Sequence, residues 1–205
     1  MEVIIKNYFI KVFNGMALGL FSSLLIGLIL KQVGMLVKLD LLIQFGDMAQ
    51  KLMAPAIGIS LGLNGLAAGA AIVGGESHMV GFSIASYREN GFGGLISQGL
   101  GTSMLQIGNI VKKPIIMLPA IISSIILGPI STVIFKMQAT PAGSGMGTSG
   151  LVGEFSTYSV MVKNAFLGVL LLHFILPGLI SYFVSSFMYK KGYIKMEDMK
   201  LSNDK

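Results

Sequence analysis

The sequence predicts an all-α fold: a polytopic helical membrane protein with about four full transmembrane helices plus re-entrant and interfacial segments. Hydrophobic residues make up 53% of the 205 residues, and charged residues only 12%. A soluble domain carries roughly 25% charged residues, so this chain lacks the charge that a water-facing surface requires. Its 15 lysines and arginines stand mostly at the ends of apolar stretches, where lipid headgroups accommodate their charge.

The four predicted spans are apolar stretches without Lys, Arg, Asp or Glu, close to the roughly 20 residues that cross a bilayer. They cover residues 12–30, 52–72, 114–135 and 165–189. The first lacks the small-residue cleavage pattern of a signal peptide. Pro119 and Pro129 predict kinks in the third span. His173 is the ionisable residue of the fourth, and we interpret it as an interhelical hydrogen-bonding side chain.

Glycines recur around the second span in steps of four and three residues, at Gly58, Gly62, Gly65 and Gly69. On a helix these positions form one stripe, along which a neighbouring backbone approaches closely. We therefore expect self-association and a homo-oligomer in the lipid bilayer.

The segments between the spans differ from one another. Residues Lys31–Lys51 alternate charged and apolar positions, which predicts an amphipathic interfacial segment. Residues 91–111 carry no charge but are dense in Gly, Ser, Gln and Asn, as in a re-entrant or cavity-lining segment. Residues 136–164 form a long Gly/Ser/Thr loop. We expect a single membrane domain over residues 1–189 and a charged, disordered cytoplasmic tail over residues 190–205.

The basic residues predict the orientation of the chain. Lysines precede the first span and follow the last, and Arg88, Lys112 and Lys113 lie between the second and third. By the positive-inside rule all three groups are cytoplasmic. The sequence thus predicts a multi-pass protein of a bacterial plasma membrane with both termini in the cytoplasm. The three lysines of Lys31–Lys51 depart from this pattern, because they would lie outside.

Several classes of function are excluded by the sequence. The chain has no cysteine, so disulfides, thiolate metal sites and cysteine nucleophiles are absent. There is no catalytic triad, metal-ligand motif or dinucleotide fingerprint, so we predict no metal and no cofactor. The Gly-rich segment 141–154 lacks the Lys–Ser/Thr pair of a phosphate-binding loop. Basic residues do not cluster with aromatic ones, which argues against a nucleic-acid partner.

The candidate site lies where Gly74 and Gly75 are followed by Glu76 and His78. A charge at membrane depth usually faces a cavity or a partner, and a glycine-broken helix frees backbone groups to bind polar solutes. We take Glu76 and His78 as candidate catalytic residues. The candidate substrate-binding residues are Gly74, Gly75, Asn64, Gln98, Gln106 and Asn109. A polar loop at the membrane surface is the alternative interpretation of the same segment.

Four strings of the sequence resemble one membrane family. They are NGMALGLFSSLLIGLILKQVG (14–34), LGLNGLAAGAA (61–71), MVGFSIASYRENGFGGLISQGLGTSMLQIGNIV (79–111) and PAGSGMGTSGLVG (141–153). The chain is similar to the phosphotransferase-system EIIC family, type 2, whose members include proteins named as perfringolysin regulators. The resemblance implies the membrane permease subunit of a phosphoenolpyruvate-dependent sugar phosphotransferase system. It also implies a sugar substrate and cytoplasmic partner subunits of the EIIB and EIIA type.

The chain departs from this family in its length. Members are longer, with extra spans between the segment like residues 51–57 and the segment like residues 59–66, which here meet near Gly58. The sequence therefore predicts a short form that lacks the middle of the usual domain. Two other hypotheses stay open beside transport: a membrane regulatory or sensor protein of the perfringolysin-regulator kind without transport activity, and a truncated remnant.

In the transport hypothesis, a phosphorylated partner subunit docks on the cytoplasmic side and supplies the phosphoryl group. Glu76 or His78 orients the sugar hydroxyl or accepts its proton. The chain has no phospho-cysteine and no recognisable phosphocarrier domain, so it depends on a separate donor subunit.

Overall fold

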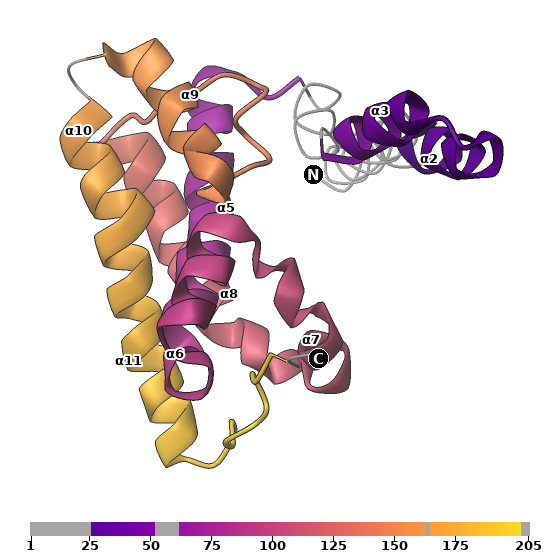
Figure 1. Ribbon diagram of the computed structural model, residues 1–205. Helices are drawn as coiled ribbons and strands as arrows, with labels where there is room; N and C mark the ends of the chain where they lie inside the picture. Colours follow the sequence, from indigo (N-terminus) through magenta and orange to yellow (C-terminus); the bar gives the residue numbers. More distant parts are fainter. Residues whose placement is uncertain (1–25, 52–61, 163–164, 202–205) are drawn as a thin grey trace, which may run out of the picture. The chain divides into compact units, whose positions relative to one another are not determined.

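The computed structural model describes residues 26–51, 62–162 and 165–201 (Figure 1). Within these ranges the chain is helical, with no strand and one isolated bridge between Gly65 and Ala139. The predicted all-α class is therefore confirmed for the described residues. The chain divides into two units, residues 1–64 and 65–205, which we describe separately.

The first unit contains two packed helices, α2 (Ile26–Val37) and α3 (Asp40–Lys51). They run antiparallel, because Gly27 lies against Gly46 and Gly34 lies against Ile43. Any Cβ on these glycines would approach the opposite backbone to 2.8 Å or less, so close packing requires glycine. Nζ of Lys31 lies 2.8 Å from Oδ1 of Asp47 across the pair.

This helical pair differs from the sequence prediction. The first predicted span was expected to end before Lys31, whereas α2 continues through Lys31 to Val37. The reason is that Lys31 pairs with Asp47 on the neighbouring helix, which satisfies its charge within the unit. Most of the predicted span 12–30 lies outside the described residues, so its crossing of the membrane stays a prediction.

The second unit is built from helices of three kinds. The α-helices are α5 (Gly65–Ala85), α6 (Tyr87–Ile96), α7 (Ile107–Lys112), α8 (Leu118–Pro129), α9 (Val152–Met161), α10 (Ala165–Gly168) and α11 (Leu176–Lys190). The π-helical segments are η2 (Ser97–Gly101), η5 (Ile130–Ile134) and η8 (Val169–Ile175). The 3₁₀ segments are η3 (Ser103–Gln106), η4 (Pro114–Met117) and η6 (Ser149–Leu151).

Helix α5 is the central element of this unit and packs against α8 and α11 (Figure 1). Apart from Glu76 and His78, its residues are small or apolar on every face, which is typical of a buried helix. One core cluster at its start includes Val73, Leu127 and Leu172. A second cluster at its end includes Phe82 and Ile116. The site described below lies on the stretch of α5 between the two clusters.

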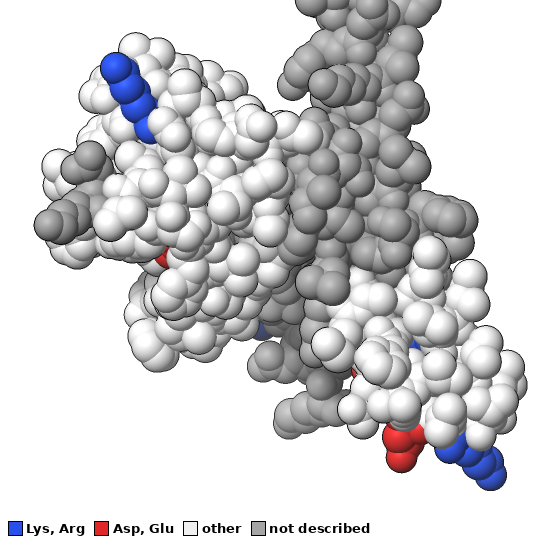
Figure 2. All heavy atoms as spheres, turned by 90° about the horizontal axis from the view of Figure 1, so that it is seen from above, with Lys and Arg blue, Asp and Glu red and all other residues white. Residues whose placement is uncertain are grey.

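Two helical rods among the described residues are long and apolar enough to cross a membrane, Pro114–Ile134 and Ala165–Lys190. They match the third and fourth predicted spans. Their outer faces carry exposed apolar side chains such as Ile125, Val133 and Phe183. On the face drawn in Figure 2, nearly all of the described surface belongs to uncharged residues. In the third span Pro119 lies in the first turn of α8 and Pro129 at its end, where the π-helical η5 follows.

The second predicted span does not form one helix across its described part. Gly62 and Gly65 have positive φ values of 64° and 49°, a conformation that interrupts a right-handed helix and favours glycine. Helix α5 begins only at Gly65, so these glycines form no continuous helical stripe. Gly69 does permit close packing, but against the backbone of Met137 in the same chain. The four-span topology and the homo-oligomer therefore stay predictions.

The polar segment after α5 is irregular, as the sequence predicts. Gly91 interrupts α6 with a φ of 57°, and the following residues change from α- to π- to 3₁₀-helix within a few turns. The side chains of Gln98 and Gln106 are completely buried. The prediction of a loop over residues 136–164 is only partly correct, because the second part of this segment forms η6 and α9.

Residues 191–201, the described part of the tail after α11, are packed rather than disordered. Ile194 and Met199 are buried in the second core cluster. The carbonyl of Met199 accepts hydrogen bonds of 2.8 Å from Asn90 Nδ2 and Gln106 Nε2. Its charged composition predicted disorder, but two apolar anchors and these amide contacts hold residues 191–201 against the unit.

An ion pair adds to this docking. Nζ of Lys113 lies 2.5 Å from Oδ2 of Asp198, and the backbone N–H of Lys195 donates to the same oxygen at 2.6 Å. Partial burial by itself raises the pKa of Asp198. The hydrogen bonds from Lys113 and Lys195 and the charges of both lysines outweigh it, and the pKa lies below its ordinary value.

Asp198→Asn is expected to loosen the tail. At pH 7 we expect the amides of residues 194–201 to exchange hydrogen about fivefold faster than in the unchanged protein, as for the loss of a partly exposed ion pair. A group with a lowered pKa stabilises the fold above its unfolded pKa, about 4 for Asp. The difference between the proteins should therefore shrink as the pH falls through the lower, folded-state pKa of Asp198.

Hydrogen-exchange mass spectrometry measures this effect. Glu197→Gln is the matched control, since Glu197 is mostly exposed and only meets Lys200 at 3.4 Å. Equal exchange in Asp198→Asn and the control at pH 7 would contradict the docking role of the ion pair.

Candidate functional site

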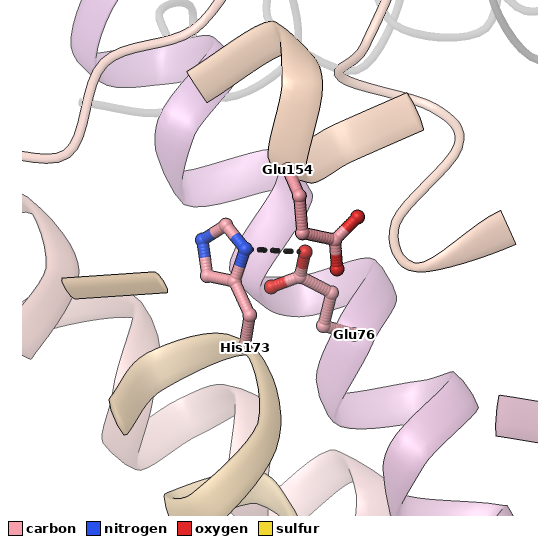
Figure 3. A group of neighbouring side chains, drawn as sticks. All are labelled: Glu76, Glu154 and His173. Carbon is pink, nitrogen blue, oxygen red and sulfur yellow. Dashed lines mark ion pairs between the residues drawn. The ribbon is translucent and has the colours of Figure 1, made fainter. Parts of the chain in front are cut away.

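Three ionisable side chains from separate elements meet inside the second unit (Figure 3). They are Glu76 of α5, Glu154 of α9 and His173 of η8. Nδ1 of His173 lies 2.7 Å from Oε1 of Glu76, the separation of an ion pair. One ligand atom from each of the three lies within 4.8 Å of the others. Figure 3 shows the carboxylate of Glu154 directed toward that of Glu76.

The group is enclosed by protein. Glu76 and His173 have no exposed surface, and Glu154 is 6% exposed. Apart from the contact between Glu76 and His173, neither carboxylate and neither ring nitrogen has a hydrogen-bond partner within the described ranges. Burying a polar group without a hydrogen bond costs about 1–3 kcal/mol per group. A polar solute that enters this group would therefore find unused donors and acceptors.

Helix α5 positions Glu76 without a break. The sequence analysis took Gly74 and Gly75 as an interruption, but α5 passes through both and continues to Ala85. A Cβ on Gly74 would meet nothing within 4 Å, and a Cβ on Gly75 would lie at an ordinary contact distance of 3.5 Å from the Cα of Gly147. The close approach requires glycine at position 147 instead, where a Cβ would lie 3.1 Å from the carbonyl carbon of Gly75 and 3.2 Å from the backbone nitrogen of Glu76. Gly147 thus lets the Gly-rich segment lie directly on the helix beside Glu76.

The Gly-rich segment brings Glu154 to this place. Gly147 and Gly150 have positive φ values of 52° and 56°, which turn the chain into η6 and α9. A Cβ on Gly153 would lie 2.4 Å from the carbonyl oxygen of Gly147, so the first turn of α9 closes against the loop before it. Glu154 lies in that first turn, where the helix dipole favours a negative charge.

The third side chain comes from a π-helical stretch. His173 lies in η8, within the fourth predicted span. Such wider turns occur inside α-helices mostly as short pieces and often at functional sites. The predicted interhelical contact of His173 is confirmed, and its partner is Glu76.

His78 lies outside this group. Its Nδ1 is 2.7 Å from Oγ of Ser103, and its ring meets that of Phe82 edge-on at 4.9 Å. Residues two apart on a continuous helix point in different directions. Because α5 is unbroken, the side chains of Glu76 and His78, the two candidate catalytic residues, point in different directions. The imidazole beside Glu76 is that of His173.

The predicted amide ligands form a separate network. Gln106 Nε2 donates to Oε1 of Gln98 at 2.9 Å, and Asn109 Nδ2 donates to Oε1 of Gln106 at 2.8 Å. Both Gln106 and Asn109 also bind carbonyls of the docked tail. Asn64 is exposed just before α5. None of these four belongs to the group around Glu76, and the contacts observed favour a structural role for the three that form the network.

Two residues of the group were missed as site residues from the sequence. Glu154 stood at the end of a Gly-rich loop, and His173 lay alone in an apolar helix. One feature of the sequence could have indicated them. Each is an ionisable residue in a nearly uncharged stretch, and such residues tend to pair with one another at membrane depth.

The arrangement supports three kinds of chemistry. Carboxylates and imidazole hydrogen-bond the hydroxyls of a polar solute, and a carboxylate beside an imidazole accepts a proton from such a hydroxyl. Two carboxylates and one imidazole are also donors that bind divalent cations. The sequence predicted no metal, and this donor set arises only from the folded arrangement.

Comparison with known proteins adds one match. A family model described as "Phosphotransferase system, EIIC" matches the chain over residues 10–61 and 56–201. The match comes in two pieces that meet at residues 56–61, the region where the sequence predicts a missing middle. No curated protein and no solved structure matches the chain.

Breaking the buried pair should destabilise the protein. We expect His173→Leu to lower the free energy of unfolding by about 3 kcal/mol, because Glu76 then lacks its buried partner. Adding Glu76→Leu should restore at least half of that loss, since the carboxylate that lost its partner is then removed as well. Thermal unfolding in detergent measures both variants. His78→Leu is the control and should cost about 1 kcal/mol, and strictly additive losses in the double variant would contradict the pairing.

Proposed function

Because the chain belongs to the phosphotransferase-system EIIC family, type 2, a family of membrane components of sugar phosphotransferase systems, we propose that it forms a sugar-translocation site. Glu76, Glu154 and His173 are its sugar-binding centre. The observation that carries this proposal is the burial of these three ionisable side chains together inside the helix bundle. Ionisable residues at such depth mark a solute pathway far more often than a purely structural contact.

The chemistry of a sugar suits these three side chains. A sugar presents several hydroxyls close together, and carboxylates accept hydrogen bonds from them in pairs. His173 is held by Glu76 at one ring nitrogen, so its Nε2 remains for a second hydroxyl. Glu154 arrives from a different element and adds a third point of contact, which fixes the orientation of a ring as well as its position.

The centre also suits phosphoryl transfer from a partner subunit. The phosphorylated EIIB-type subunit binds on the cytoplasmic side and presents its phosphoryl group. The sugar hydroxyl oxygen forms a bond to phosphorus while the bond between phosphorus and the donor residue breaks. The proton of that hydroxyl passes to the carboxylate of Glu76, which His173 orients. The phosphorylated sugar then leaves on the cytoplasmic side, and the partner is rephosphorylated by an EIIA-type subunit.

Access to the centre requires a movement of the segment that covers it. The contacts between the Gly-rich segment and the rest of the unit include a side-chain hydrogen bond and close backbone packing. The hydroxyl of Thr148 donates to the carbonyl of Gly99, and Gly147 lies on Gly75. Movement of this segment with α9 withdraws Glu154 and opens the pair of Glu76 and His173. Closure around the sugar then excludes water from the transfer step.

The short length of the chain bears on the assembly. The family match consists of two pieces that overlap at residues 56–61, which supports a form without the middle of the usual domain. A second copy of the chain then supplies the walls of the translocation site that the extra spans supply in longer members of the family. The translocation site in this proposal is part of a homo-oligomer.

Uptake in reconstituted vesicles tests the proposal. With a phosphorylated EIIB-type donor and a panel of labelled sugars, we expect Glu76→Gln and His173→Gln to reduce phosphorylation-coupled uptake at least about 100-fold, as for loss of a general base. His78→Gln is the matched control and should stay within about threefold of the unchanged protein, because one partly buried hydrogen bond contributes little.

Two outcomes would overturn the proposal. Full uptake by Glu76→Gln would remove Glu76 from the transfer step. Lack of uptake by the unchanged protein with every sugar and donor would leave the regulatory or remnant hypotheses.

A further inference from the structure

A pocket lies away from the buried group, lined by residues from the end of α5, from α6 and from α11. Its volume is about 450 Å³, within the range of small-molecule sites. Apolar and aromatic side chains line most of it, among them Ile84, Phe92, Leu95 and Tyr182. Arg88 and Ser186 stand at one edge.

Arg88 is the one arginine of the sequence. Few groups of the described residues compensate its positive charge. Its Nη2 reaches Oγ of Ser186 at a long 3.4 Å, and its guanidinium carbon lies 5.6 Å from the centre of the Tyr189 ring. It forms no ion pair with any residue of the described ranges. Most of the five N–H donors of the guanidinium are thus available to an anion.

Arg88 belongs to α6 but lies beside Ser186 of α11. The position of Ser186 near the end of α11 places Arg88 at the level of lipid headgroups. Ser186 lies one turn before Lys190, the last residue of the helix, so about 6 Å separate them along the axis. Exposed aromatic side chains occupy the same final turns, including Tyr182, Phe183 and Phe187. Aromatic residues followed by lysines are typical of the membrane–water interface.

We propose that this pocket binds an anionic phospholipid, with the lipid phosphate on Arg88 and an acyl chain along Ile84, Phe92 and Leu95. Charge complementarity and shape argue for this occupant. A guanidinium binds phosphate through two parallel hydrogen bonds, and the hydroxyl of Ser186 lies beside it as a further donor. The apolar lining suits a hydrocarbon chain, whereas a free phosphate ion would make no contact with that lining. The proposal is independent of the sugar site, since it shares no residue with it.

Native mass spectrometry of the full-length chain in detergent tests this site. Titration with phosphatidylglycerol should give a dissociation constant about fivefold lower than titration with phosphatidylcholine, the preference expected from one basic residue at an anionic headgroup. Arg88→Gln should abolish that preference. Lys190→Gln is the matched control, because it removes a cation at the same helix end outside the pocket, and it should keep the preference.

A second variant separates the site from an effect on folding. Leu95→Trp keeps the charge of Arg88 but fills the apolar part of the pocket, and it too should lose the preference for phosphatidylglycerol. Thermal unfolding verifies that each variant is folded, and if Arg88→Gln is not, Leu95→Trp decides. Equal binding of the two lipids by the unchanged protein, or an unaltered preference in a folded variant, would overturn the proposal. Displacement of the lipid by excess inorganic phosphate would show a site for a free anion instead.

Discussion

The burial of Glu76 in the middle of α5 is the constraint on which the larger unit depends. A carboxylate in a low-dielectric interior is costly unless other groups compensate it. The compensation comes from His173, almost a hundred residues later in the chain. Glu154 joins the group from a third element. Helices α5 and α9 and the π-helical η8 must therefore keep a defined mutual arrangement, and an apolar bundle without this group would have no such requirement.

Glycine makes that arrangement sterically possible. The sequence analysis interpreted Gly74 and Gly75 as a helix break and the series from Gly58 to Gly69 as a contact stripe between copies. In the structure two glycines of α5 are sites of close approach within one chain. Gly69 admits the backbone of Met137, and Gly81 admits the side chain of Ser181. A pattern of small residues reveals that something approaches, but the partner and the local backbone conformation depend on the whole fold.

The polar residues after α5 show a similar division. Their density correctly predicts an irregular, partly buried segment, since Gln98 and Gln106 are completely buried. The partners of Gln106 and Asn109 in the docked tail could not be predicted, because they lie about ninety residues away along the chain. Composition suggested that this tail is disordered. Two buried apolar residues, Ile194 and Met199, and a row of backbone carbonyls bound by amides outweigh its charge.

By itself, the sequence determined the helical class, the two apolar rods at the third and fourth predicted spans, and the family. These follow from local properties: hydrophobicity over a span and characteristic strings. Only the tertiary structure decided which imidazole contacts Glu76: it is that of His173 and not that of His78. Sequence proximity favoured His78, but a continuous helix turns residues two apart in different directions. The packing of α5 against η8 and the Gly-rich segment alone determines which distant side chains share its buried face.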